Sequence, residues 1–370
     1  MRPDLALFLH SFEMGGAQKR TLALAAEIAR RGRRVDLVVA RDEGPLRSAV
    51  PAAVAVRALG GVGAGARIGR DAALAWSVPA LATYLRKEQP RVLAAAANHG
   101  AFAAIAAHGL AGRDTALILR VSNPLVGGRN RLKDRLRRWL FRRLASRVDA
   151  FACVSAQTRR EVVALAPAAE ARAKVVVNPV APPAEAIPPA RSSDPSHPAL
   201  VGIGRLVPQK GFDVLIRALA RLGPEVRLTL VGEGPERSAL QALATEVGVA
   251  DRVVFAGEHA DPLPWMAAAD AVVLPSRFEG MPGVLIEAMA CGRAVVASDL
   301  PSVREVLQGL DAPLVPAGDP EALAAGVSAA LTRPIDAEAY ARRARRFSAE
   351  GAADDFLALM AAAEARRAGA

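Results

Sequence analysis

The sequence is poor in cysteine and histidine, and each shortage excludes a class of site. Its two cysteines, Cys153 and Cys291, lie far apart in apolar stretches, which argues against a disulfide framework or a zinc site and favours buried free thiols. The five histidines are scattered and no Asp-x-Asp pair occurs, so a divalent cation lacks protein ligands. We therefore expect no metal and no cofactor.

Long apolar runs are also missing. No stretch of 18 or more residues is both apolar and free of charge, so no segment is expected to span a membrane. The short run Leu5–Leu9 lacks the length and the cleavage pattern of a signal peptide, which favours a cytoplasmic protein. At 370 residues the chain is too long for one ordinary core and fits two domains.

Acidic residues are too few to balance the basic ones, and the net charge of +11 indicates an anionic partner. Residues 129–147 hold nine basic residues and one acid. Their apolar residues recur at helical spacing, at Leu132, Leu136, Trp139, Leu140 and Leu144. Such a helix suits an anionic membrane surface, here the inner face of the plasma membrane, although a helix packed on its own domain has the same pattern. Nucleic acid is not expected, because no aromatic stacking platform accompanies the charge.

Short apolar runs alternate with helical patterns along both halves of the chain. In the first half we expect strands at Leu5–Leu9, Val35–Val39, Val92–Ala96, Leu117–Val121 and Ala150–Val154. In the second half we expect them at Leu200–Gly204, Arg227–Val231, Val253–Phe255, Ala271–Leu274 and Ala294–Ala297. The clearest helical patterns are Thr21–Arg31, Phe212–Leu222 and Arg237–Glu246. This alternation predicts an α/β fold with two doubly wound parallel sheets.

A proline-rich stretch separates the two halves. Residues 178–198 hold seven prolines, which disfavour regular elements and favour a semi-rigid connector. We therefore predict a first domain at 1–180, a connector at 181–198 and a second domain at 199–350. The tail from Pro334 to Ala370 has the pattern of two or three helices.

The segment 276–292 carries the strongest functional signal. It follows an expected strand, passes through a turn into a helical pattern, and places Glu279 and Glu287 eight residues apart. The turn consists of Gly280, Met281 and Pro282. Backbone N–H groups and two carboxylates would thus lie at the carboxyl end of a strand, where open α/β sheets bind ligands.

Two other strand-to-helix junctions carry groups that suit an anion. Gly15 and Gly16 precede the first helix, where a close backbone approach and the helix dipole favour negative charge. Arg205 and Lys210 follow the first strand of the second half, where two cations could neutralise a diphosphate. Taken alone, each junction is explained equally well by a plain turn or by surface cations.

Together these residues resemble the family 4 glycosyltransferases. The resemblance covers nearly the whole chain, and its strongest segments are 14–21, 204–213 and 276–292, the last with the paired glutamates Glu279 and Glu287. It implies the GT-B arrangement, two Rossmann-like α/β domains facing each other across a cleft. It also implies that a final helix, at about 352–370, packs back on the first domain.

The resemblance implies an activity and a set of roles. A retaining enzyme of this family would move a sugar from a UDP- or GDP-linked donor to a glycan or lipid-linked acceptor in polysaccharide or lipopolysaccharide synthesis. Arg205 and Lys210 would hold the departing diphosphate, with Gly15 and Gly16 opposite it. Glu287 would bind the ribose, and Glu279 with the loop Gly280, Met281 and Pro282 would position the donor sugar.

The acceptor side departs from the family pattern. Many members have a histidine after a first-domain strand, whereas this chain has Ser122, followed by Asn123. His99, after an earlier strand, offers an imidazole, so His99, Ser122 and Asn123 are all candidates. A serine would be a poor base, which fits a mechanism in which the leaving phosphate takes the acceptor proton.

Two other functions suit the same architecture. A nucleotide-sugar epimerase or hydrolase would consume the donor with no acceptor present, and a non-catalytic scaffold would bind the donor without turnover. The intact set of Arg205, Lys210, Glu279 and Glu287 argues against the scaffold. A nicotinamide enzyme is disfavoured, because the glycine-rich stretches at 60–65 and 232–237 both fail the Gly-x-Gly-x-x-Gly pattern.

Overall fold

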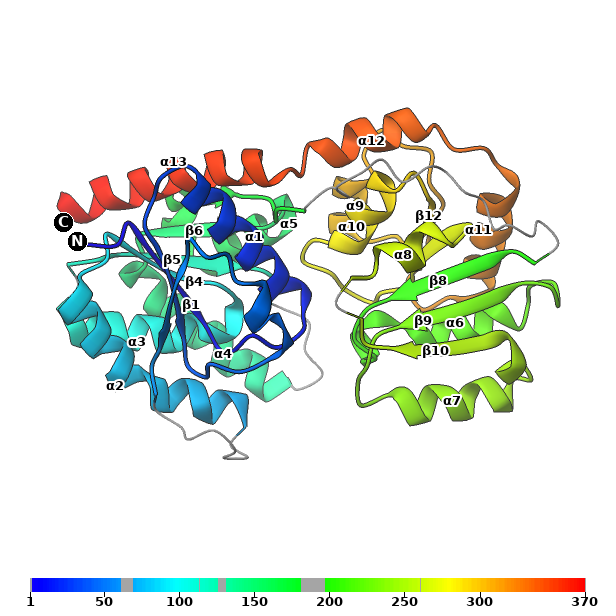
Figure 1. Cartoon of the computed structure of the whole chain (residues 1–370), viewed down its shortest axis with the longest axis horizontal. Helices are drawn as coiled ribbons and strands as arrows, with labels where there is room; N and C mark the ends of the chain where they lie inside the picture. Colours follow the sequence, from blue (N-terminus) through cyan, green and yellow to red (C-terminus); the bar gives the residue numbers. More distant parts are fainter. Residues whose placement is uncertain are drawn as a thin grey trace. The chain divides into compact units, whose positions relative to one another are not determined.

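The computed structural model describes residues 2–60, 69–112, 114–125, 131–180, 197–259 and 261–369. The chain divides into unit 1, formed by Met1–Pro179 and Ala349–Ala370, and unit 2, formed by Val180–Ser348. Each unit is a parallel sheet with helices packed on it, which confirms the α/β class (Figure 1). The predicted connector 181–198 lies outside the described residues, except for its last two.

Unit 1 contains a seven-stranded sheet in the order β3-β2-β1-β4-β5-β6-β7. The strands are β1 (Leu5–Leu9), β2 (Val35–Val39), β3 (Ala55–Ala58), β4 (Val92–Ala95), β5 (Ala116–Val121), β6 (Ala150–Cys153) and β7 (Ala173–Val175). The helices are α1 (Gly16–Arg30), α2 (Arg70–Glu88), α3 (Ala101–Ala111), α4 (Arg131–Leu144), α5 (Ala156–Leu165) and α13 (Ala349–Ala368). Short 3-10 turns are η1 (Pro45–Ala49), η2 (Asn98–Gly100), η3 (Ala145–Arg147) and η4 (Pro167–Arg172). The strand order reverses between β1 and β4, as in doubly wound sheets.

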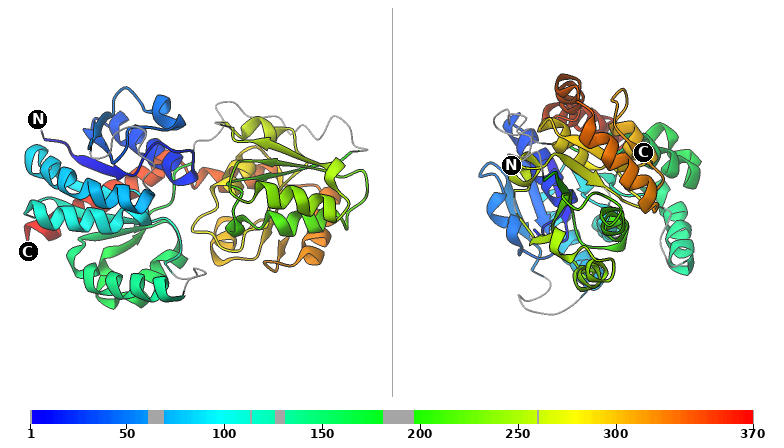
Figure 2. Two further views of the ribbon diagram at one scale, coloured as in Figure 1. Left: turned by 90° about the horizontal axis from the view of Figure 1, so that it is seen from below. Right: turned by 90° about the vertical axis from the view of Figure 1, so that its right-hand side faces the viewer.

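Both faces of the unit 1 sheet are buried. In β1, Leu5 and Leu7 join a core with α1 and α13, whereas Ala6 and Phe8 join a second core with α2 and α3. The alternation arises because successive side chains of a strand point to opposite faces. Figure 2 shows the helices on both sides of the sheet. Burial on both faces explains why these strands read as continuous apolar runs in the sequence.

Unit 2 contains a six-stranded sheet in the order β10-β9-β8-β11-β12-β13. The strands are β8 (Ala199–Ile203), β9 (Arg227–Val231), β10 (Val253–Gly257), β11 (Ala271–Leu274), β12 (Ala294–Ser298) and β13 (Leu314–Val315). The helices are α6 (Phe212–Leu219), α7 (Arg237–Glu246), α8 (Leu263–Ala267), α9 (Gly283–Ala290), α10 (Pro301–Val306), α11 (Pro320–Thr332) and α12 (Ala337–Arg345), with 3-10 turns η5 (Pro208–Lys210) and η6 (Ala250–Arg252). Its order reverses between β8 and β11, which are hydrogen-bonded neighbours.

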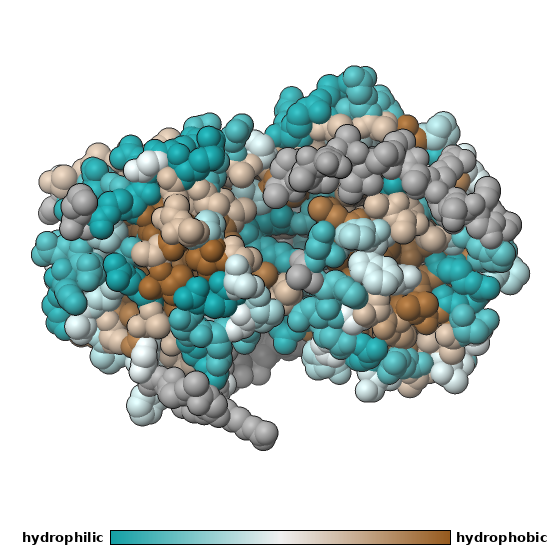
Figure 3. Space-filling view, viewed as in Figure 1, coloured by the Kyte–Doolittle hydropathy of each residue, from teal (hydrophilic) through white to brown (hydrophobic). Residues whose placement is uncertain are grey.

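The surface mixes polar and apolar residues, as Figure 3 shows for one face. No helix in the described part of the chain is long and apolar enough to cross a bilayer. Among the side chains that the structure describes, the exposed large hydrophobic ones are Trp76, Leu110, Leu136, Trp139, Val254, Phe278 and Leu314. Four of the seven lie on α2, α3 and α4, whose inner sides all contribute to the same core of unit 1.

Candidate functional site

The carboxyl edge of the unit 2 sheet brings two loops together at the point where the strand order reverses. The loop after β8 contains Arg205 and η5, and the loop after β11 runs from Pro275 to Pro282 and leads into α9. Backbone and side-chain groups of the two loops bond to each other, as Arg277 N donates to the Gln209 carbonyl at 2.8 Å. Ligands of open α/β sheets bind at this position.

Lys210 and Glu279, two residues predicted from the sequence, form an ion pair with 2.6 Å between Nζ and Oε1. Ser276 Oγ donates to the same carboxylate oxygen at 2.7 Å. Ser302 Oγ donates to the Glu279 backbone carbonyl at 3.0 Å. Because the Glu279 side chain is only 7% exposed and the Lys210 side chain 21%, the pair is largely shielded from water. The lysine and the carboxylate are thus fixed at one edge of the sheet.

A second ion pair fastens the same loops. The Arg277 guanidinium binds both oxygens of Asp213, at 2.8 and 2.7 Å, and also donates to the Pro208 carbonyl at 2.8 Å. Gln209 Nε2 donates to the Phe278 carbonyl at 3.0 Å. Burial alone would raise the pKa of Asp213, but Arg277 and two backbone N–H groups outweigh it and lower that pKa below its usual value. The loop that carries Lys210 is therefore held against the loop that carries Glu279.

Two glycines allow these loops to approach closely. Gly211 has a φ of +67°, and a Cβ there would lie 2.1 Å from the Pro275 carbonyl oxygen. Gly232, after β9, has a φ of +143°, and its Cβ would lie 2.0 Å from the Gly204 carbonyl oxygen. Larger residues would force the loops apart, because both the backbone conformation and the space require glycine.

The remaining predicted residues of unit 2 lie in or beside these loops. Arg205 is exposed, and its side chain has no hydrogen bond or ion pair with another described residue. Gly280, Met281 and Pro282 are buried in the turn before α9, and Glu287 is half-buried on that helix. The structure brings Lys210 and Glu279 into contact, and Arg205 follows the same strand as Lys210. Their roles towards a donor stay predictions.

In unit 1, Gly15 and Gly16 lie where β1 leads into α1. Gly15 is extended, with a φ of 179°, and no side chain of the described residues caps the start of α1. A Cβ at Gly16 would meet nothing within 4 Å. The fold itself therefore does not require glycine at Gly16, and the predicted approach to a diphosphate stays a prediction.

The acceptor-side candidates gather at the carboxyl ends of β1, β4 and β5. Asn98 Oδ1 accepts from the Ser122 backbone N–H at 2.8 Å and from Ser122 Oγ at 3.3 Å. Asn98 Nδ2 donates to the Asn123 carbonyl at 2.8 Å. The rings of His99 and His10 make an edge-to-face contact with 6.5 Å between their centroids. Sequence reasoning missed His10 and Asn98, although both follow expected strands, because neither matches a motif.

Sequence reasoning also missed Arg120. This arginine of β5 is 3% exposed and donates to Thr21 Oγ1 at 3.0 Å and to Asn178 Oδ1 at 2.7 Å. Burial lowers the pKa of Arg120 to about 10, and no carboxylate among the described residues pairs with it. The signal in the sequence is an arginine inside the apolar run Leu117–Val121. Its hydrogen bonds join β5 to Thr21 on α1 and to Asn178, near the end of the Met1–Pro179 segment of unit 1.

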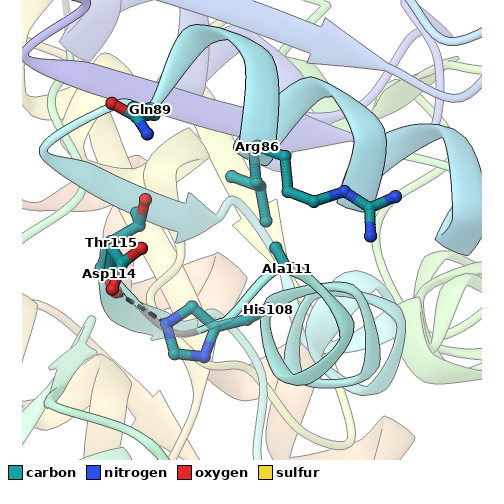
Figure 4. A pocket seen from close by; sticks show the side chains of 7 residues that line it. Arg86, Gln89, His108, Ala111, Asp114 and Thr115 are labelled. Atoms are coloured by element: carbon teal, nitrogen blue, oxygen red, sulfur yellow. Dashed lines mark hydrogen bonds between the residues drawn. The ribbon is translucent and has the colours of Figure 1, made fainter.

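A small cavity of about 70 Å³ lies elsewhere in unit 1 (Figure 4). Its lining includes Arg86, Gln89, His108, Asp114 and Thr115. The buried His108 donates from Nε2 to the Thr115 carbonyl at 2.6 Å. Because Thr115 precedes β5, the cavity lies at the amino edge of the sheet, opposite the loops described above. His108 therefore has a structural hydrogen bond, and the cavity is not part of the candidate site.

Two family descriptions match the chain, one in each unit. Residues 14–182 match the family described as Glycosyltransferase Family 4, and residues 197–333 match Glycosyl transferases group 1. The two matches include all the strands of unit 1 from β2 to β7 and all the strands of unit 2. All the predicted residues of both units fall inside them, whereas His10, which sequence reasoning missed, precedes the first match.

The chain is similar to curated relatives over part of its length. It is 37% identical over 173 residues to the lipopolysaccharide core biosynthesis glycosyltransferase LpsE of Rhizobium meliloti, which covers 44% of this chain and 50% of LpsE. It is 38% identical over 165 residues to a GDP-mannose-dependent alpha-(1-6)-phosphatidylinositol monomannoside mannosyltransferase of Mycolicibacterium smegmatis, which covers 41% of this chain and 43% of the relative. The chain thus spans about half the length of the relatives that it matches.

The fold has a close counterpart among solved structures. The crystal structure of Anabaena Alr3699/HepE in complex with UDP and glucose matches 97% of this chain and 100% of its own, with a TM-score of 0.77 and 20% identity. At that identity the match shows the fold alone, and it confirms the predicted GT-B class. The two family matches, which together span most of the chain, show that it belongs to the family 4 and group 1 glycosyltransferases.

Proposed function

We propose that this chain is a retaining, metal-independent glycosyltransferase that takes a sugar from a UDP- or GDP-linked donor. The acceptor is a glycan or lipid-linked sugar in the synthesis of cell-surface polysaccharide or lipopolysaccharide. The observation that carries the proposal is the Lys210–Glu279 pair, with Arg205 on the same loop as Lys210, at the switch point of the unit 2 sheet.

Charge explains why a lysine and a carboxylate belong together at a donor site. A diphosphate repels a carboxylate, so Glu279 alone would disfavour the donor. Lys210, within 2.6 Å of Glu279, neutralises the carboxylate and can meet the phosphates on its other side. Arg205 adds a second cation from the same loop. As the bond to the sugar breaks, the two cations stabilise the charge that develops on the leaving diphosphate.

The roles proposed for the other residues are those that the family resemblance implies. Glu287 on α9 would bind the ribose hydroxyls, and Glu279 with the buried turn Gly280, Met281 and Pro282 would position the donor sugar. Gly15 and Gly16 would face the diphosphate from unit 1. The role of LpsE in lipopolysaccharide core biosynthesis, and the UDP and glucose in the complex of Alr3699/HepE, support this substrate class.

A thermal-shift screen tests the donor site. We expect one nucleotide class among UDP-, GDP-, ADP- and dTDP-sugars to raise Tm, and Arg205→Ala and Glu287→Ala to abolish the rise. Arg221→Ala and Glu246→Ala are matched controls, since the exposed Arg221 lies just after the end of α6 and the exposed Glu246 is the last residue of α7, both away from the loops. A shift that persists in both site variants would contradict the assignment of the site.

Turnover then separates the transferase from its alternatives. A transferase should consume the donor rapidly only when an acceptor is present, and EDTA should leave the rate unchanged. An epimerase or a hydrolase would consume the donor alone, and a scaffold would show a Tm rise without turnover. Consumption of the donor without an acceptor, or a Tm rise without turnover, would contradict the proposed reaction. Neither result would contradict the assignment of the donor site.

The proposal extends to the membrane surface, because α4 carries an apolar face that the unit does not bury. Phe141 and Leu144 pack against the core, whereas Leu136 and Trp139 are 56% and 53% exposed. Arg143 lies over the Trp139 ring, with 5.6 Å to its centroid. An exposed apolar face beside arginines suits the interface of an anionic bilayer. We therefore propose a cytoplasmic protein that binds the inner face of the membrane, where it meets a lipid-linked acceptor.

Liposome sedimentation tests this surface. We expect binding to phosphatidylglycerol vesicles, weaker binding to phosphatidylcholine vesicles, and loss of binding in Leu136→Ser/Trp139→Ser and in Arg142→Gln/Arg143→Gln. The control Arg221→Gln/Arg227→Gln removes the same charge from exposed positions of unit 2. Equal binding by the α4 variants and the control would contradict the membrane role, even if donor binding were intact.

A further inference from the structure

We infer that His99, with its ring positioned by His10, contacts the acceptor hydroxyl, and that Ser122 instead holds the loop in place. The inference rests on the proposed function and concerns the acceptor side of the same site. It assigns His10, a residue that no motif indicates, as a positioning residue.

The two histidines lie at the switch point of the unit 1 sheet. His10 follows β1 directly, and His99 lies in η2, shortly after β4. The two strands are parallel neighbours in register, with Phe8 opposite Ala95, so their carboxyl ends are level. In doubly wound sheets this is where a ligand of the domain binds. Both imidazoles are therefore at the place where unit 1 would hold its substrate.

The geometry gives the two rings different roles. His10 is 4% exposed, and its Nδ1 lies 3.0 Å from Ser11 Oγ, so its ring is buried and hydrogen-bonded. The ring of His99 meets it at an interplanar angle of 84°, an edge-to-face arrangement that fixes relative orientation. His99 is only half-buried. The buried ring can therefore orient its neighbour, and the half-buried one can reach a ligand.

Ser122 has a different set of contacts. Its hydroxyl and its backbone N–H both point to Asn98 Oδ1, and the Asn98 amide donates onward to Asn123. The only hydroxyl proton of Ser122 is thus directed to Asn98. These bonds tie the loop after β5 to η2, the turn that carries His99. Ser122 and Asn123 therefore support the position of His99 rather than replace it.

The chemistry needs only a positioned acceptor. The N–H of a neutral imidazole can donate to the acceptor oxygen and orient that oxygen toward the anomeric carbon, which leaves the alcohol proton directed at the leaving phosphate. The bond from the acceptor oxygen to that carbon forms as the bond to the diphosphate breaks, and the alcohol proton passes to the leaving phosphate oxygen. His99 orients the hydroxyl in this step and takes no net proton.

Transfer kinetics with octyl glycosides of glucose, galactose and mannose as acceptor probes test the inference. For His99→Gln we expect kcat/KM for the acceptor to fall about 100-fold, the order seen for positioned catalytic groups, while the donor KM stays within about 3-fold. Ser122→Ala should stay within about 5-fold, because a neutral hydrogen bond contributes modestly. His197→Gln, an exposed histidine of unit 2, is the matched control.

His10 is tested by two variants. His10→Phe keeps a ring for the edge-to-face contact and should retain activity within about 5-fold, whereas His10→Ala should lose about 10- to 30-fold with the donor KM unchanged. If His10 only stabilised the fold, the His10→Phe and His10→Ala variants would both lose Tm and activity together. If His10→Ala does not fold, His99→Gln and His10→Phe still decide the question.

The outcomes separate this inference from the proposed function. If the wild-type chain transfers to a probe and His99→Gln matches it, the inference is wrong and the proposed function stands. A large loss in Ser122→Ala with full activity in His99→Gln would assign the acceptor to Ser122. If the wild-type chain glycosylates none of the probes, the proposed function fails for this acceptor class and the inference falls with it.

Discussion

The carboxyl edges of the two sheets differ in chemistry although the six strands of the unit 2 sheet follow the same order as the first six of the unit 1 sheet. In unit 2 the loops are fastened by ion pairs, Lys210–Glu279 and Arg277–Asp213. In unit 1 the corresponding loops are fastened by neutral groups, through Asn98, Ser122 and the contact of two histidine rings. Because the strand order is the same, the difference lies in the loops, as expected where function is carried by sites added to a fold.

This contrast matches the two ligands that the proposed reaction needs. A nucleotide sugar brings a diphosphate, whose charges need cations already held in place, whereas a sugar hydroxyl needs only hydrogen-bonding partners. Unit 1 also holds close charge pairs: Asp149–Arg367 lies at the amino edge of its sheet, and Arg41–Glu43 and Arg47–Asp42 lie within the loop after β2. At the switch point itself, an ion pair thus joins the two loops of unit 2, whereas neutral groups join the loops of unit 1.

The largest expected effect is the loss of Lys210. Lys210→Ala should lower kcat by about 100- to 1,000-fold, the order measured when a group that stabilises developing negative charge is removed. The exposed Lys87→Ala is the control. Steady-state kinetics with the donor identified by the thermal-shift screen measure the effect, and a loss confined to KM would mean that Lys210 binds ground state and transition state alike.

A double variant sharpens the role of the ion pair. Lys210→Ala leaves the buried Glu279 carboxylate without its cation, which should cost about 3 kcal/mol of stability as for other broken buried pairs. Lys210→Ala/Glu279→Gln removes that charge and should regain most of the Tm without regaining activity. Recovery of both together would mean that the lysine acts through stability alone.

The second-largest expected effect is a loss of stability when Arg367 is removed, with catalysis unchanged. Arg367 of α13 binds both oxygens of Asp149, which also accepts from the Leu117 N–H at 2.7 Å. Because the Asp149 side chain is 7% exposed, Arg367→Ala leaves a buried carboxylate short of a partner, and we expect a loss of about 3 kcal/mol. Urea unfolding measures the loss. A change in donor or acceptor KM in the folded variant would contradict the separation of the two sheet edges.

The sheets were predictable from the sequence because their strands are buried on both faces. Every strand that was predicted agrees with the structure within two residues at each end. β3, β7 and β13 were missed, since each is a short, partly exposed strand at the edge of its sheet. α1 begins at Gly16, five residues earlier than predicted, because no capping side chain marks its start. Local patterns thus identify buried elements and miss elements that lack a buried face or a cap.

The site was predictable only where one segment carries its signal. Glu279 and the turn after it form a continuous motif, whereas the Lys210–Glu279 pair joins residues that are 69 apart in the chain. His10 and Asn98 act through neighbours on other strands, so no local pattern identifies them. The apolar stripe of 129–147 was predicted as one face, but the structure divides it, with Leu144 packed and Leu136 exposed.

The smallest expected effect concerns the second ion pair and depends on pH. The Asp213 and Arg277 side chains are 36% and 39% exposed, so Asp213→Asn should cost less than about 1 kcal/mol near neutral pH. Since the pKa of Asp213 is lowered on folding, its contribution is present above the usual value of 3.8 and is lost as pH falls through the lower folded value. The Tm gap between wild type and Asp213→Asn should therefore close below about pH 4. Asp251→Asn, at an exposed aspartate without a described ion pair, should show no such gap at any pH. A gap that persists in acid would mean that Asp213 fastens the loop by shape and neutral hydrogen bonds, and the ionic link between the loops after β8 and β11 would then rest on the Lys210–Glu279 pair.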